Sequence, residues 1–259
     1  MGDEVCYSAA NGIGQITLDG SDSYNYLNND LLGEFLDVLE EVRADDHLKG
    51  VSISGSGGNF CAGAETSMFR EAVEYGDRAT VDRFIGRIHR VTRELEELAV
   101  PVLAVVDGYA LAGGLELLLA CDLRLAAADA QFGDEHTKYG LVPGGGATQR
   151  LYRQLDTVKA NELVFTDRRL SGAEAQAYGV VTKSVPPDKL AEEAAAFESS
   201  LAKRSRASVE ITKRLIREGN SIPKQQGLAL ERHAVVEHYF TEDAKRGFRA
   251  LTENRRPEF

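Results

Sequence analysis

Two short apolar segments, each followed by a glycine-rich loop, constrain the fold of this chain most strongly. Residues 50–54 precede a loop at residues 55–63, and residues 102–106 precede a second loop at residues 108–114. The second loop leads into an apolar helical segment at residues 115–120, so that strand, loop and helix recur. This alternation predicts a parallel or mixed sheet covered by helices, and therefore an α/β fold.

The flanking segments extend this architecture. Residues 5–18 partly alternate between apolar and polar side chains, which predicts a strand pair with a turn at Asn11-Gly12. Apolar residues at helical spacing predict one helix over residues 32–42 and another over residues 81–98. The chain looks mostly helical from about residue 143, and three or four helices are predicted after residue 190.

Composition excludes several classes of protein. The length of 259 residues allows one large α/β domain with a helical appendage, and the net charge of −11 disfavours nucleic acid and anionic membranes as partners. No apolar run is long enough to span a bilayer, and the first five residues do not resemble a signal peptide, which predicts a cytoplasmic protein. Cys6, Cys61 and Cys121 lack C-x-x-C spacing, which predicts buried free thiols instead of disulfides or a zinc site.

The glycine-rich loops do not match phosphate-binding motifs. No glycine run leads into the Lys and Ser/Thr of a Walker loop. The dinucleotide fingerprint fails because Gln149 and Phe60 stand where its last glycine would be. Each loop instead follows a buried strand, at the edge of the sheet where α/β proteins bind ligands.

Two main-chain amides at these loops are candidates for an oxyanion hole. Gly113 stands at the start of a predicted helix, so its N–H is free and lies at the positive helix end. Ala64, after the first strand, offers a second N–H. Two converging N–H donors are what a thioester oxygen requires when it becomes an oxyanion. The alternative interpretation is that the glycines only permit tight turns.

Glu116 and His136 are candidate acid–base groups. Glu116 lies three residues after Gly113 on the same helix face, although a helix dipole alone also favours a glutamate there. His136 lies in a polar segment at residues 132–140, and an ordinary pKa of about 6.5 suits a histidine to proton transfer. A hydrogen-bonded structural histidine is the alternative.

Several ordered motifs resemble the crotonase superfamily, and within it the enoyl-CoA hydratase/isomerase family. Residues 60–65, Phe-Cys-Ala-Gly-Ala-Glu, are similar to the crotonase F-x-A-G-A-D segment. Residues 101–116, which end in Ala-Gly-Gly-Leu-Glu, resemble the second oxyanion-hole segment. The resemblance continues in order through residues 121–122, 131–133, 140–151, 242–248 and 255–259, so it covers nearly the whole chain.

The resemblance implies an α/β crotonase (ClpP/crotonase-like) fold. Residues 1–190 would form a ββα spiral core with the acyl-CoA site, and residues 191–259 a helical region used in trimerisation. The protein would be a homotrimer or a dimer of trimers, with no metal and no cofactor beyond the CoA of its substrate. The N–H groups of Ala64 and Gly113 would hold the thioester oxygen. The residues implied in substrate binding are Ala62, Ala64, Glu65, Thr66, Ser67 and Gly113.

The resemblance also implies that Glu116 is the first of two catalytic glutamates, whereas His136 stands where hydratases carry the second. Glu135 is adjacent but one position out of register. Three functions follow as hypotheses. The first is hydration of 2-enoyl-CoA, or a related enolate reaction of the isomerase type. The second is a decarboxylase or a β-diketone (C–C bond) hydrolase that uses His136 as an altered acid/base. The third is a non-catalytic acyl-CoA or RNA-binding scaffold.

Overall fold

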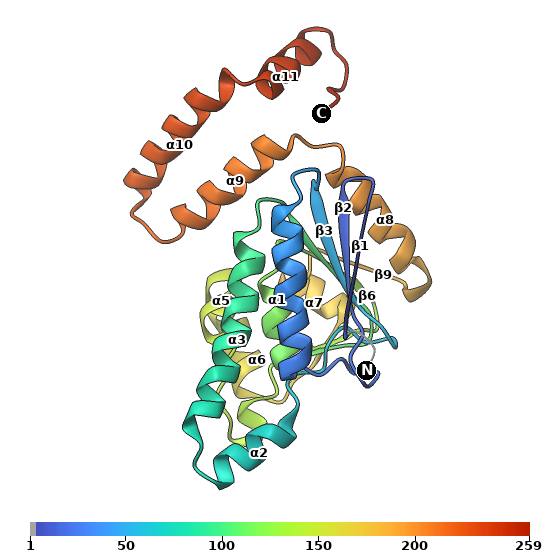
Figure 1. The fold of residues 1–259 in the computed structure, drawn as a ribbon, viewed down its shortest axis with the longest axis vertical. Helices are drawn as coiled ribbons and strands as arrows, with labels where there is room; N and C mark the ends of the chain where they lie inside the picture. The colour runs from blue at the N-terminus through green and yellow to red at the C-terminus, as the bar shows by residue number, and fades with distance from the viewer. Residues whose placement is uncertain (1–3) are drawn as a thin grey trace.

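The computed structural model describes residues 4–259 as a body of strands and helices from which the last helices project (Figure 1). The strands are β1 (Val5–Ala10), β2 (Ile13–Leu18), β3 (Gly50–Gly55), β4 (Val102–Val106), β5 (Tyr109–Leu111), β6 (Leu123–Ala127), β7 (Gln131–Gly133), β8 (Leu170–Ser171) and β9 (Lys183–Val185). The α-helices are α1 (Asn29–Ala44), α2 (Thr66–Glu74), α3 (Arg78–Glu97), α4 (Gly113–Leu119), α5 (Ala147–Gln154), α6 (Thr157–Phe165), α7 (Gly172–Tyr178), α8 (Leu190–Leu201), α9 (Arg206–Gly219), α10 (Lys224–Tyr239) and α11 (Glu242–Thr252). Two 3₁₀ turns, η1 (Thr137–Tyr139) and η2 (Pro187–Lys189), complete the elements.

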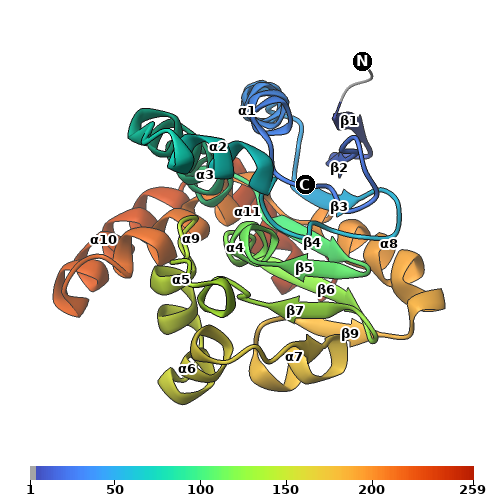
Figure 2. The same cartoon turned by 90° about the horizontal axis from the view of Figure 1, so that it is seen from below.

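A six-stranded sheet in the order β1-β2-β3-β4-β6-β9 forms the centre of the body. Its strands pair in parallel except for the β1–β2 hairpin, whose turn residues Asn11 and Gly12 both have positive φ. This backbone conformation is the one that favours Asn-Gly in a two-residue hairpin. A second sheet, β5-β7-β8, lies within the same body (Figure 2). The predicted mixed sheet and N-terminal strand pair are confirmed.

Helices α1 and α3 pack against each other and help to bury the sheet (Figures 1 and 2). The side chain of Asn28 caps α1 by accepting hydrogen bonds from the N–H groups of Asp30 and Leu31. Strands β3 and β4 are mostly buried along their length, as expected of parallel strands covered by helices. The predicted helices over residues 32–42 and 81–98 are confirmed within a few residues at each end.

Some short elements lie where the sequence analysis predicted only a loop. Strand β5 lies inside the second glycine-rich loop and pairs with β7. Helix α2 follows the first loop, in a segment for which no element was predicted. Three-residue strands are too short to produce a periodic pattern, so tertiary pairing alone defines them.

The cysteines differ from one another in exposure. Cys61 and Cys121 are buried, and burial raises the pKa of each thiol to about 12. Cys6 is exposed, so the prediction of a buried thiol is wrong at this position. The physical reason is that β1 is the edge strand of its sheet, and much of its length faces solvent.

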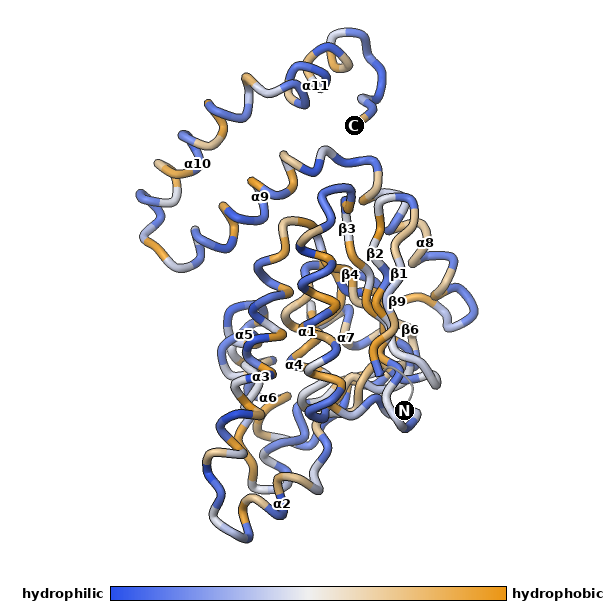
Figure 3. The backbone as a smooth tube through the Cα atoms, viewed as in Figure 1, coloured by the Kyte–Doolittle hydropathy of each residue, from blue (hydrophilic) through white to orange (hydrophobic). Residues whose placement is uncertain are grey.

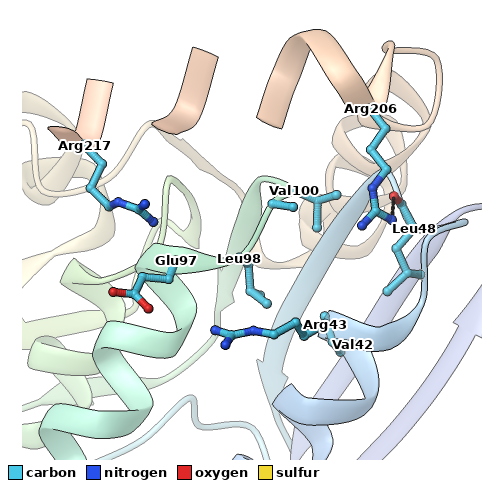
Figure 4. Close-up of a pocket in the computed structure, with 9 residues that line it drawn as sticks. Val42, Arg43, Leu48, Glu97, Leu98, Val100, Arg206 and Arg217 are labelled. Atoms are coloured by element: carbon cyan, nitrogen blue, oxygen red, sulfur yellow. Dashed lines mark hydrogen bonds between the residues drawn. The ribbon is translucent and has the colours of Figure 1, made fainter. Parts of the chain in front are cut away.

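The C-terminal helices divide into one that packs on the core and three that project. Helix α8 contacts β3 and β6, whereas α9, α10 and α11 extend beyond the body (Figure 1). Arg206, at the start of α9, holds this projection to the body by donating hydrogen bonds from Nη1. One goes to the carbonyl oxygen of Asp45 at 2.7 Å, and the other goes to the carbonyl oxygen of Leu48 at 3.1 Å (Figure 4). The division at residue 190 between core and C-terminal region stays a prediction.

The projecting helices alternate between hydrophobic and hydrophilic residues along their length (Figure 3). Only Ala234 and Ala250 are buried in α10 and α11, and α9 buries none of its residues. Large apolar side chains are therefore exposed there: Ile216, Leu228, Leu230, Val235, Val236, Tyr239, Phe240, Phe248 and Leu251. Within residues 4–259, no helix has both the length and the apolar character that crossing a membrane requires.

Candidate active site

The two glycine-rich loops meet beside the sheet. They leave β3 and β4, which are parallel neighbours, so both loops start from the same edge. Two backbone hydrogen bonds join them: Cys61 N–H donates to the Tyr109 carbonyl oxygen at 2.9 Å, and Leu111 N–H donates to the Cys61 carbonyl oxygen at 3.0 Å. As a result, a Cβ atom added to Gly113 would lie 3.6 Å from the amide nitrogen of Ala64.

The N–H groups of Ala64 and Gly113 are both unengaged. In the described part of the chain, neither donates a hydrogen bond to any backbone or side-chain acceptor. Ala112, directly before Gly113, has φ 47° and ψ −116°, a conformation that residues other than glycine rarely adopt. Strain of this kind persists where the surrounding structure enforces it, and it is concentrated at functional sites.

Residues before α1 fix the first loop. Leu27 donates its N–H to the Gly63 carbonyl oxygen (2.8 Å) and accepts from the Glu65 N–H (2.9 Å), which leaves the Ala64 amide between them unpaired. The buried side chain of Asn25 donates to the carbonyl oxygen of Asn59 at 2.8 Å. Neither Leu27 nor Asn25 could be predicted from the sequence, because no local pattern indicates which distant loop a residue supports.

The side chain of Glu116 projects from α4 into the interior, and the residue is only 1% exposed. Its Oε1 accepts hydrogen bonds from the N–H groups of Gly145 (2.8 Å) and Ala147 (2.9 Å). Burial raises the pKa of the Glu116 carboxyl above its ordinary value, although these two N–H groups and the nearby His136 offset part of the effect. The result is a carboxylate fixed through one oxygen, with the other oxygen unbonded.

The loop that holds Glu116 is itself positioned by side chains. Arg150 donates from Nη1 to the Gly145 carbonyl oxygen at 2.9 Å and forms a two-point ion pair with Glu96. His89 Nε2 lies 2.6 Å from the carbonyl oxygen of Gly144. Because a carbonyl oxygen can only accept, His89 carries a proton on this nitrogen.

His136 lies next to the unbonded oxygen of Glu116. Its Nε2 is 3.9 Å from Glu116 Oε2, and its Nδ1 is 3.2 Å from Oδ1 of Asp134. Burial alone would lower the pKa of His136, but the hydrogen bond to Asp134 and the negative charges of Glu116 and Asp134 outweigh it and raise the pKa above 6.5. The structure thus brings the two predicted acid–base residues together.

Asp134 is a third member of this cluster that the sequence analysis missed. Its side chain is almost completely buried, and the D-x-H spacing to His136 was the signal that could have identified it. Glu135 does not replace the missing glutamate, because its carboxylate is bound by Arg169 (2.6 Å) and Lys138 (3.2 Å).

The residues expected to bind substrate lie around the first loop. Ala62 is half-buried and donates its N–H to the carbonyl oxygen of Tyr24 at 2.9 Å. Glu65, Thr66 and Ser67 are exposed at the start of α2, and the Ser67 hydroxyl donates to a carboxylate oxygen of Glu65 at 2.7 Å. Their part in substrate binding stays a prediction.

Comparison with known proteins gives consistent matches along the whole chain. A family model described as enoyl-CoA hydratase/isomerase matches residues 8–259. The bovine protein named enoyl-CoA hydratase domain-containing protein 2, mitochondrial, is 36% identical over 99% of this chain and 88% of its own length. The short-chain-enoyl-CoA hydratase of Clostridium acetobutylicum is 34% identical over 94% of this chain and 92% of its own. The crystal structure of an enoyl-CoA hydratase from Bacillus anthracis matches with a TM-score of 0.91 and 32% identity, covering 99% of this chain and 98% of that one.

Proposed function

Because the chain belongs to the enoyl-CoA hydratase/isomerase family, we propose that it acts on an acyl-CoA thioester through an enolate stabilised in an oxyanion hole. The α/β crotonase fold predicted from the motifs is confirmed by the similarity to a solved enoyl-CoA hydratase. The reaction favoured here is the hydration of a 2-enoyl-CoA.

One observation carries the proposal: two unengaged amides from separate loops lie close together, and a buried carboxylate stands one helical turn further along α4. A thioester oxygen placed between the N–H groups of Ala64 and Gly113 would accept from both as negative charge develops on it. Donors fixed in position by the fold need no reorganisation during the reaction. Glu116, three residues beyond Gly113 on α4, then lies beside the acyl carbons.

The acid–base step uses the gap between Glu116 Oε2 and His136 Nε2. These atoms are 3.9 Å apart, so one water oxygen can lie at a hydrogen-bond distance of about 2.8 Å from both. As this water attacks the β-carbon, Glu116 takes one of its protons and the thioester oxygen gains negative charge. Protonated His136 then gives a proton to the α-carbon, and the proton on Glu116 returns to His136. One water is added and the pair is restored.

The chemistry proposed needs no metal or redox cofactor, because Glu116, His136 and the two amides supply every proton transfer and the charge stabilisation. CoA enters as part of the substrate. The exposed apolar side chains of α9–α11 support assembly into a homotrimer or a dimer of trimers. The net charge of −11 weighs against a nucleic-acid partner. The bovine relative is named as mitochondrial, so a cytoplasmic location stays a prediction.

Turnover of purified protein tests this function. Crotonyl-CoA and longer 2-enoyl-CoAs are incubated with the enzyme, and formation of the 3-hydroxyacyl-CoA is followed. We expect hydration of at least one chain length. Normal acyl-CoA binding with no turnover of any enoyl-CoA would contradict the hydratase assignment, and the absence of any catalysed reaction would favour the scaffold hypothesis.

A second function is favoured by the hydrogen bond between His136 and Asp134. A histidine oriented by a buried carboxylate is also a general base for water, as a β-diketone hydrolase requires, and an acid for protonating the enolate left by decarboxylation. Release of CO₂ from a malonyl-type thioester, or cleavage of a cyclic diketone, would select this alternative. A gain of hydratase activity in His136→Glu would also favour specialised chemistry in the parent protein.

A further inference from the structure

Asp134 is a buried carboxylate with an unusual set of contacts. It directly follows β7, its side chain is 1% exposed, and its Oδ1 lies 3.2 Å from Nδ1 of His136. Its other oxygen, Oδ2, is buried and has no hydrogen-bond partner among residues 4–259. Burial of an under-bonded carboxylate oxygen is unfavourable, so packing alone does not explain an aspartate at this position.

The backbone between Asp134 and His136 forms a strained turn. The N–H of His136 donates to the carbonyl oxygen of Asp134 at 2.8 Å, so the turn spans three residues, and its central residue, Glu135, has φ 60°. Turns of this kind with positive φ at the centre are rare, and the conformation is strained for a residue other than glycine. The turn brings the carboxylate of Asp134 and the imidazole of His136 close enough for a hydrogen bond.

Charged side chains hold the central residue of this turn in place. Arg169 Nε donates to Glu135 Oε1 at 2.6 Å, and Lys138 Nζ donates to Oε2 at 3.2 Å. Both oxygens of Glu135 are thereby used outside the acid–base pair. A strained conformation persists only where several contacts enforce it, and here two ion pairs and the bond from His136 do so.

We propose that Asp134 is the positioning residue of the Glu116–His136 pair. It accepts the Nδ1 proton of the imidazole, which fixes the ring orientation and leaves Nε2 to exchange a proton with substrate and Glu116. The proposal rests on the function proposed above.

Charge accounting supports this role. A site with two catalytic glutamates that share one proton has a net charge of −1. In this protein, ionised Glu116 with protonated His136 has a net charge of zero. The carboxylate of Asp134 returns the cluster to −1. The histidine therefore keeps the overall charge of a two-carboxylate site when Asp134 accompanies it.

Kinetics of Asp134→Asn test the role in catalysis. The amide can turn its NH₂ group toward Nδ1, which would place the imidazole proton on the wrong nitrogen. We expect kcat to fall by about 10²-fold or more, with KM changed by less than about threefold. The matched control is Asp129→Asn, an exposed aspartate five residues earlier, which should retain the parent kcat. A parent-like kcat in folded Asp134→Asn would overturn the proposal.

Nitrogen NMR of the histidines provides a test that needs no activity. The signals of His136 are assigned by their loss in His136→Gln, and the charged groups that the structure places at its ring are Glu116 and Asp134. In the parent protein we expect the neutral ring to carry its proton on Nδ1, and in Asp134→Asn the titration midpoint of His136 should move to lower pH. A proton on Nε2 of the neutral ring in the parent, or an unchanged midpoint in the variant, would overturn the proposal. If the parent hydrates no enoyl-CoA, the proposed function fails, while these spectra still decide the role of Asp134.

Discussion

Replacement of Glu116 by glutamine isolates the proton-transfer step from the architecture around it. Glutamine has nearly the same volume, and its carbonyl oxygen can accept the two hydrogen bonds that Gly145 and Ala147 donate to Oε1. The site has no room for a larger change, because even a Cβ atom added to Gly145 would lie 2.5 Å from Glu116 Oε2. The amide should therefore occupy the position of the carboxylate and lose only its ability to take up a proton.

The expected size of the effect follows from this geometry. General acid–base catalysis contributes roughly 10²–10⁴ in rate, so kcat of Glu116→Gln should fall by that factor, or by about 3–5 kcal/mol in barrier height. KM should change by less than about threefold, because the oxyanion donors Ala64 and Gly113 are untouched. The assay is steady-state hydration of crotonyl-CoA, with the exposed Glu97→Gln as the matched control.

The same substitution should not reduce stability at neutral pH. Burial raises the pKa of Glu116 in the folded protein above its ordinary value of 4.5. The stability that this carboxyl contributes is therefore present below pH 4.5 and is lost as the pH rises through the raised pKa. In urea unfolding, the parent should gain stability relative to Glu116→Gln between pH 7 and pH 5. For the kinetic prediction, a folded Glu116→Gln variant with kcat within tenfold of the parent would refute the role of Glu116 in proton transfer.

Three further predictions concern the same site. Gly145→Ala should lower kcat by roughly 10²-fold in the hydration assay, because the added methyl collides with Glu116; an unchanged kcat would contradict the tight fit. Gly114→Ala should cost about 3 kcal/mol of unfolding free energy in urea, since its Cβ would lie 2.0 Å from a backbone oxygen of the first loop. The control Gly86→Ala, on an exposed helix face with open space, should not be destabilising. The pH profile of kcat/KM should be bell-shaped. Its acid limb, from Glu116, should have a midpoint above pH 4.5, and its alkaline limb, from His136, a midpoint above pH 6.5. An alkaline midpoint below pH 6.5 would contradict the raised pKa of the histidine.

The parts of the site that could be predicted depend on local sequence. The strands before each loop are apolar runs bounded by glycine, and parallel strands end at one edge, so the proximity of Ala64 and Gly113 follows from topology. Glu116 could be placed beside them because three residues separate neighbours on one helix face.

The rest of the site depends on contacts that no local pattern indicates. The backbone groups that fix Glu116 lie about thirty residues further along the chain, at Gly145 and Ala147. The contact between Asp134 and His136 depends on positive φ at Glu135, a conformation that glutamate rarely adopts. Sequence patterns describe common backbone conformations, so a strained turn held in part by a distant ion pair, Arg169 with Glu135, cannot be predicted from them.

The central claim, that the amides of Ala64 and Gly113 polarise one thioester oxygen, is tested most directly by the vibration of the bound carbonyl. Butyryl-CoA labelled with ¹³C at the thioester carbon has no double bond to hydrate, so its infrared spectrum on the enzyme reports the ground state of the complex. We predict that its carbonyl stretch moves to lower frequency than in free butyryl-CoA, because two hydrogen bonds weaken the C=O bond. A bound carbonyl that absorbs at the free frequency would contradict the account.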